Sequence, residues 1–174
     1  MGNFFESLEH TSWVMTIAET GWLYAAVSVT HYFTLFVLVG TIVLVDLRIL
    51  GVAARSQSVT QVADTLFPWT WTALGLALLS GFLMFTTDGG DYYPDRIFRV
   101  KMTVILLALI STVIVSRNVR KWDQAPAIST RAKLVALVSI VLWIGSILAG
   151  VEIAVGSSRL QFEAEDAAHA EEDL

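Results

Sequence analysis

The sequence contains no cysteine, and only 16% of its 174 residues are charged. Without cysteine the chain forms no disulfide bond and offers no thiolate to a metal ion or an iron–sulfur cluster. Soluble domains carry about 25% charged residues, so the shortage of charge favours a membrane protein. Residues 1–20 also lack lysine and arginine, and we therefore expect this segment not to be a cleavable signal peptide.

Apolar residues make up 55% of the chain and gather in four blocks. The blocks are Trp22–Val45, Trp69–Phe85, Val104–Val115 with its flanks, and Leu134–Val155. Because a helix rises ~1.5 Å per residue, about 20 apolar residues cross a hydrocarbon core ~30 Å thick. The first and last blocks meet this length, and the middle two meet it with their flanking residues. The sequence predicts an all-α, polytopic membrane protein with a four-helix transmembrane bundle over residues 21–156.

Two segments flank the predicted bundle. Residues 1–20 intersperse aromatic and aliphatic side chains with Glu6, Glu9 and His10, which is typical of an amphipathic helix lying at the membrane interface. Residues 157–174 form an acidic tail with six Asp and Glu residues between positions 163 and 173 and no lysine or arginine after Arg159. We expect this tail to be solvated and poorly ordered in isolation.

Three connections are expected between the helices, over residues 47–67, 86–99 and 117–133. Pro68 closes the first, and an Asp-Gly-Gly-Asp run with Pro94 marks the second. Within the first connection, Ser58 or Thr60 is a predicted helix cap. The side with the first and third connections holds seven lysine and arginine residues against four on the other side, which predicts that both termini lie outside the cytoplasm.

Small residues spaced four apart predict where the helices pack, because such residues let backbones approach closely in lipid. The positions are Gly145, Ser146, Ala149, Gly150 and Ala154 in the last block, and Ala77 and Gly81 in the second. We expect a neighbouring backbone to approach most closely at Gly150. The last helix is therefore predicted to be the central packing element, within the bundle or across an oligomer interface.

Ionisable residues inside predicted spans are functional candidates, because a charge in the bilayer is costly. They are His31, Asp46, Arg48, Lys101 and Glu152. Asp46 and Arg48 are two residues apart and do not face each other on a helix. Arg117 or Lys133 is the expected partner of Asp46, and lipid phosphate that of Arg48. Lys101 and Glu152 lie at similar depth, and either the two side chains pair or Glu152 reaches water.

His31 has the strongest functional case. A neutral imidazole ligates haem iron or copper, or relays protons. A six-coordinate b-type haem needs a second axial ligand, and the candidates are Met84, His10 folding inward, or His31 of a second copy. No dedicated metal site is predicted.

Two other interpretations of His31 remain open. In the first, the imidazole is structural and hydrogen-bonded to Ser28 or to a facing hydroxyl such as Ser80 or Ser111. In the second, His31 and Glu152 form a proton or ion pathway.

Several stretches between Trp22 and Val155 form a recurring pattern. They are His31 with Val45-Asp46-Leu47-Arg48-Ile49-Leu50-Gly51, Phe67-Pro68-Trp69-Thr70-Trp71, Tyr92-Tyr93 with Phe98-Arg99-Val100-Lys101, Trp122-Asp123 with Pro126, and Leu142-Trp143 with Ala149-Gly150. This pattern resembles an uncharacterised family of small four-helix bacterial inner-membrane proteins. The resemblance implies the fold and the location and brings no established reaction. The chain departs from the family pattern at three positions. Relatives often carry an acidic residue, a histidine and an arginine where this chain has Ser28, Ser116 and Val151, respectively.

These departures shift the prediction towards a structural or accessory role. The leading hypothesis is a non-enzymatic subunit or assembly protein of the bacterial inner membrane, as part of a respiratory or photosynthetic complex. A b-type haem protein with His31 as axial ligand is the first alternative, and the proton or ion pathway is the second. The expected partners are the lipid bilayer and a second copy or other membrane subunits, with no nucleic acid.

Overall fold

The computed structural model describes the chain apart from residues 1–10, 12–13, 17–19, 93–95 and 173–174, and leaves the side chains of residues 88–92, 97 and 152–172 undescribed. Four long helices follow one another: α3 (Gly21–Leu50), α4 (Val59–Tyr92), α5 (Arg96–Asp123) and α6 (Thr130–Glu172). Each contains a stretch long and apolar enough to cross a membrane. This confirms the predicted all-α fold with four transmembrane helices. The predicted interfacial helix lies mostly outside the described residues and stays a prediction.

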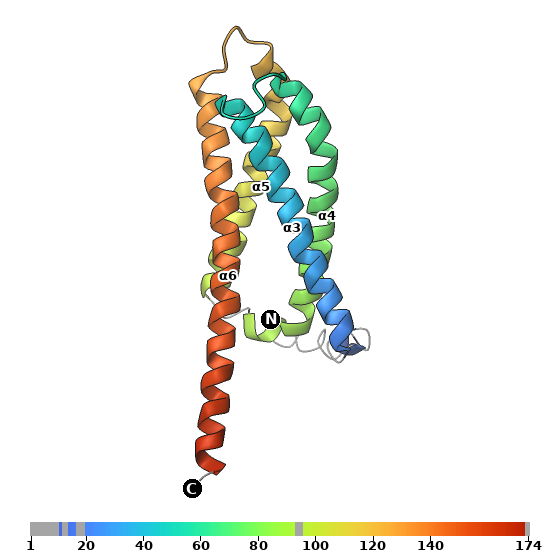
Figure 1. Cartoon of the computed structure of the whole chain (residues 1–174), viewed down its shortest axis with the longest axis vertical. Coiled ribbons are helices and arrows are strands. Elements are labelled where there is room, and N and C mark those ends of the chain that lie inside the picture. The colour runs from blue at the N-terminus through green and yellow to red at the C-terminus, as the bar shows by residue number, and fades with distance from the viewer. Residues whose placement is uncertain (1–10, 12–13, 17–19, 93–95, 173–174) are drawn as a thin grey trace.

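The four helices form a closed ring of contacts. Helix α3 packs against α4 and α6, and α5 packs against the same two helices. The short connections 51–58 and 124–129 lie at one end of the bundle, called here the loop end (Figure 1). Helices α3 and α6 are close together there and diverge towards the other end, where α6 continues past the bundle.

The two connections that flank α4 are shorter than predicted because two expected helix breakers lie inside α4. Helix α4 begins at Val59, passes through Pro68 and continues to Tyr92, across the Asp-Gly-Gly-Asp run. Proline has no N–H and frees the carbonyl group four residues earlier. That carbonyl belongs to Asp64, whose side chain is exposed near the loop end. Membrane helices tolerate such a break because other groups satisfy the freed carbonyl.

The acidic tail also differs from expectation, since α6 stays helical to Glu172. Alanine and glutamate, with four residues each, are the commonest residues of this segment, and both are strong helix formers. The tail extends an existing helix and therefore needs no nucleation step of its own.

Both helix ends at the first connection are capped. The N–H of Val52 donates to Leu47 O and that of Gly51 to Arg48 O, at 2.9 and 3.1 Å, and Gly51 adopts φ +77°. This is a Schellman cap, which favours glycine because other side chains are strained in this conformation. At the start of α4, Ser58 Oγ accepts from Gln61 N–H at 3.1 Å and Gln61 Oε1 accepts from Ser58 N–H at 2.9 Å. This capping box confirms Ser58 as the predicted cap.

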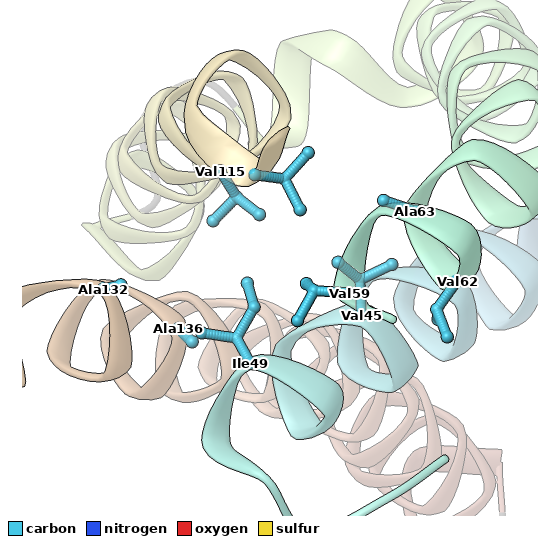
Figure 2. Close-up of a cluster of buried hydrophobic side chains, with 9 residues drawn as sticks. Val45, Ile49, Val59, Val62, Ala63, Val115, Ala132 and Ala136 are labelled. Carbon is cyan, nitrogen blue, oxygen red and sulfur yellow. The ribbon is translucent and has the colours of Figure 1, made fainter. Parts of the chain in front are cut away.

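The core consists of two apolar clusters to which all four helices contribute. The cluster at the loop end is aliphatic throughout (Figure 2) and comprises Val45, Ile49, Val59, Val62, Ala63, Val115, Val119, Ala132 and Ala136. The central cluster comprises Leu38, Val39, Ile42, Ala73, Ala108 and Trp143. Trp143 Nε1 donates to Thr112 Oγ1 at 3.0 Å, and Thr70 Oγ1 donates to Thr41 Oγ1 at 2.9 Å. These buried hydrogen bonds join α6 to α5 and α4 to α3, as polar side chains do between membrane helices.

Candidate functional site

His31 of α3 is held by the facing surface of α4. Its Nδ1 lies 3.1 Å from the carbonyl oxygen of Ala77 and 3.0 Å from Ser80 Oγ. A carbonyl oxygen only accepts, so Nδ1 carries the hydrogen and Nε2 keeps its lone pair. Ser80 Oγ in turn donates to the carbonyl of Leu76 at 2.7 Å. The facing hydroxyl predicted for His31 is therefore Ser80.

The other two hydroxyl groups considered for His31 do not reach it. Ser28 Oγ is buried without a hydrogen-bond partner in the described part of the chain. Ser111 donates to the carbonyl of Ala108 in its own helix at 2.7 Å.

The imidazole of His31 lies directly on Gly81. A Cβ atom at Gly81 would be 2.9 Å from His31 Cε1, a separation at which one of the two groups must move. Gly81 was predicted as a position of helix packing, and its neighbour here is the histidine ring. The missing side chain at Gly81 lets His31 fit between α3 and α4.

Lys101 of α5 has a comparable place on α6. A Cβ atom at Gly150 would lie 3.3 Å from Lys101 Nζ and 3.6 Å from Cε. The imidazole of His31 and the amine of Lys101 thus each contact a glycine of a neighbouring helix. We call His31, Ser80, Gly81, Lys101 and Gly150 the His31 layer.

For two other predicted members of this site, Met84 and Glu152, the described structure gives no contact with His31 or Lys101. Met84 is half-buried and follows Ala77 by seven residues, so it lies on the same face of α4 as the groups that hold His31. No hydrogen bond or ring contact joins it to His31 among the described residues. The side chain of Glu152 lies outside the described residues, so its pairing with Lys101 stays a prediction.

The small-residue ridge of α6 is packed differently from the prediction. At Gly145 a Cβ atom would meet nothing within 4 Å, and at Gly150 it would meet only Lys101 side-chain atoms. Among the described residues no neighbouring backbone comes close at these two glycines, because α6 diverges from α3 and the Lys101 side chain lies on Gly150. Close approach across an oligomer interface stays a prediction. Ser146 and Ala77 are buried and Ala149 is half-buried, while the side chain of Ala154 lies outside the described residues.

Asp46 and Arg48 have different surroundings although they are close in sequence. Asp46 is fully buried, and both carboxyl oxygens lack a hydrogen-bond partner among the described residues. Its expected partners Arg117 and Lys133 are exposed and make no ion pair with it in the described chain. Arg48 Nε donates to the carbonyl of Gln57 at 2.7 Å, so Arg48 holds the first connection against the end of α3.

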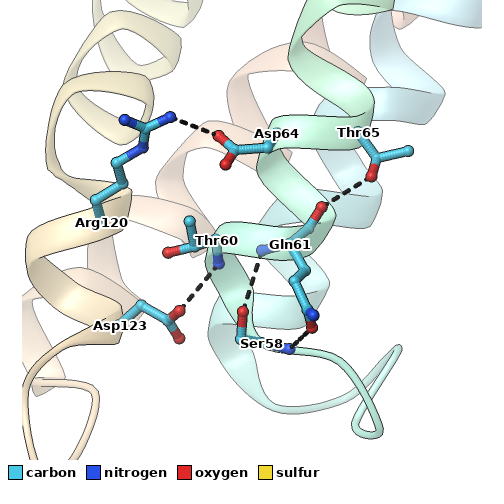
Figure 3. Close-up of polar contacts among 7 residues, drawn as sticks. All are labelled: Ser58, Thr60, Gln61, Asp64, Thr65, Arg120 and Asp123. Carbon is cyan, nitrogen blue, oxygen red and sulfur yellow. Dashed lines mark hydrogen bonds and ion pairs between the residues drawn. The ribbon is translucent and has the colours of Figure 1, made fainter.

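The sequence reasoning missed the role of Asp123 at the end of α5. Its two carboxylate oxygens accept hydrogen bonds from the N–H groups of Val59 and Thr60, each at 3.1 Å. One turn away, Arg120 and Asp64 form an exposed ion pair at 3.0 Å (Figure 3). Asp123 of α5 therefore caps the start of α4. This contact could not be predicted from the sequence, because an aspartate at the end of one helix does not indicate which other helix it contacts.

Four spanning helices around one histidine-containing polar layer define a multi-pass membrane protein. The chain belongs to a family of unknown function, DUF6644, whose model matches residues 4–156. No curated protein and no solved structure matches the chain. The match agrees with the predicted resemblance to an uncharacterised family, while the motif around His31 stays a prediction.

Proposed function

We propose that this protein is a non-enzymatic subunit or assembly protein of the bacterial inner membrane that works within a larger respiratory or photosynthetic complex. The excess of basic residues at the loop end supports a cytoplasmic position for that end and an outside position for both termini. Helix α6 contains an apolar stretch, Thr130–Val151, that is long enough to cross a membrane.

The observation that carries this proposal is the length of α6. Its 43 residues correspond to a rod of about 65 Å, whereas the hydrocarbon core is ~30 Å thick. The C-terminal part of α6, which carries the acidic residues, therefore projects beyond the bundle (Figure 1). A lone polar helix is marginal in water unless something packs against it. A basic surface on a partner subunit would stabilise this acidic arm.

Native mass measurement after mild solubilisation tests the proposal. The wild type, purified from its own membranes, is expected to run well above the 19.1 kDa of one chain. A variant that ends at Ser158 is expected to lose partner mass. A control with glutamine at the six acidic tail positions keeps the helix formers and removes the charge, so it separates loss of the arm from loss of its charge. A wild type that is monomeric under all mild conditions would overturn the proposal.

A specific observation favours haem binding as a second candidate function. Histidines that bind metals usually donate their other ring N–H to a carbonyl or carboxylate, which fixes the tautomer and the ring orientation. His31 does so through Nδ1 and the carbonyl of Ala77, which leaves Nε2 for iron. The second ligand would be Met84 or His31 of a second copy.

The visible spectrum of the purified protein tests this candidate. A Soret band is expected in the wild type and is expected to be lost in His31→Ala. Thr103→Ala is the control, because Thr103 is exposed and bonds only to Arg99 O of its own helix in the described chain. Absence of the band, or a band that persists in His31→Ala, rules out ligation by His31.

A further inference from the structure

The loop end of the bundle encloses two polar side chains that no role described so far uses. Asp46 of α3 and Ser139 of α6 are both fully buried. Both Asp46 carboxyl oxygens and Ser139 Oγ lack a hydrogen-bond partner in the described chain. The two residues line one narrow internal space, which is too small for a water molecule. Buried polar groups normally have a partner, and an exception needs an explanation.

The groups that face Asp46 carry no charge. The space is completed by Phe67 from α4 and by Thr112 and Val115 from α5, together with Ile42 and Val45 of α3. No lysine, arginine, histidine or second carboxyl group lines it. A carboxylate ion enclosed in this way would be both desolvated and unpaired, which costs many kcal/mol.

A metal cation is a poor explanation for this arrangement. Calcium and magnesium take six or more oxygen ligands, and this space has no room for water to supply them. Thr112 already accepts a hydrogen bond from Trp143 and donates one to Ala108 O. Among the described residues that line this space, the side-chain oxygens without a hydrogen bond are those of Asp46 and Ser139. A proton needs only one of them.

We propose that Asp46 and Ser139 form a buried proton-binding site between α3 and α6. A proton taken from solvent forms an O–H bond on one carboxylate oxygen and removes the negative charge. The resulting carboxylic acid has a donor and an acceptor, as has the Ser139 hydroxyl, so a small rotation lets the two groups satisfy each other. The charge is restored when the same proton returns to water.

This site links protonation to the contact between helices. Because Asp46 has no exposed surface, its proton exchanges only when α3 and α6 separate enough to admit water. The proposal is independent of haem binding and of partner subunits, since Asp46 lies fifteen residues, or about 22 Å along α3, from His31.

Infrared spectroscopy of the full chain in detergent tests the proposal through the carbonyl stretching band of a protonated carboxyl group. At about pH 6 exposed carboxyl groups are ionised and do not contribute to this band. We expect the wild type to show one such band that shifts in D₂O, and Asp46→Asn to lack it. In Ser139→Ala the acid remains without its neighbouring hydroxyl, so the band is expected to shift in frequency.

Three outcomes would overturn the proposal. The first is a wild type without the band at this pH. The second is a band that remains in Asp46→Asn, or, if that variant does not fold, one that is unmoved in Ser139→Ala. The third is a band that appears only after sodium is replaced by choline, which would identify a sodium ion as the bound species.

Discussion

Removal of the Asp123 carboxylate is expected to destabilise the loop end of the bundle. In Asp123→Ala the N–H groups of Val59 and Thr60 lose both of their 3.1 Å bonds. Val59 is only 1% exposed, so water does not readily replace its lost acceptor. Loss of a helix cap costs ~0.5–2 kcal/mol, and two charge-assisted bonds place this case in the upper half of that range. For a chain of this size, about 1–2 kcal/mol lowers Tm by roughly 2–8 °C.

Thermal unfolding in one detergent, followed by circular dichroism, measures this effect. Asp123→Asn keeps one acceptor oxygen and is expected to fall between Asp123→Ala and the wild type. The matched control is Asp64→Ala, which breaks the neighbouring ion pair with Arg120. Both side chains of that pair are more than half exposed, and exposed pairs contribute at most about 1 kcal/mol. A Tm of Asp123→Ala equal to that of the wild type or of Asp64→Ala would refute the capping role.

Three glycine substitutions test the packing and the backbone conformation. Gly81→Ala pushes a Cβ atom into the imidazole of His31 and is expected to reduce the free energy of unfolding by roughly 1–3 kcal/mol. Its control is Gly75→Ala on the same helix, where a Cβ atom would meet nothing within 4 Å. We expect this control to leave Tm unchanged or to raise it. Gly51→Ala places a side chain at φ +77° and is expected to lose ~1 kcal/mol, whereas Gly40→Ala, in open helical surroundings, is expected to lose nothing. Gly150→Leu meets only the flexible end of Lys101, so we expect a loss of stability below about 1 kcal/mol; a loss of native mass would show that this part of α6 faces a partner.

The spans were predictable because they follow from composition and length alone. A helix that crosses the bilayer core needs a segment of about 20 mostly apolar residues. The four apolar blocks of the sequence have this composition. The errors arose at Pro68 and at the Asp-Gly-Gly-Asp run, which terminate helices in soluble proteins. In α4 both lie within one continuous helix. At Pro68 the spanning helix stays intact because other groups can satisfy the one freed carbonyl.

The orientation of side chains around each helix was much less predictable. Amphipathic periodicity identifies the buried face of a helix in water, but α3 is apolar on nearly all sides. The stripe Leu38, Ile42, Val45 and Ile49 that faces the core has apolar neighbours that face outward, such as Phe36 and Leu44. Asp46 was therefore assigned a partner at the membrane surface, although it lies on the buried side. For His31 the sequence offered three candidate hydroxyls, Ser28, Ser80 and Ser111, and the structure shows Ser80 at 3.0 Å from Nδ1.

The His31 layer and the cap at Asp123 are expected to act as energetically independent parts of the bundle. Gly81 and Thr60 are 21 residues apart on α4, which corresponds to about 31 Å. Substitutions farther apart than ~10 Å and without shared partners usually add within about 0.5 kcal/mol. The free energy lost in the double variant Gly81→Ala/Asp123→Ala should thus equal the sum of the two single losses, measured by chemical unfolding in one detergent. A clear departure from additivity would mean that α4 transmits strain along its length and that the two regions behave as one unit.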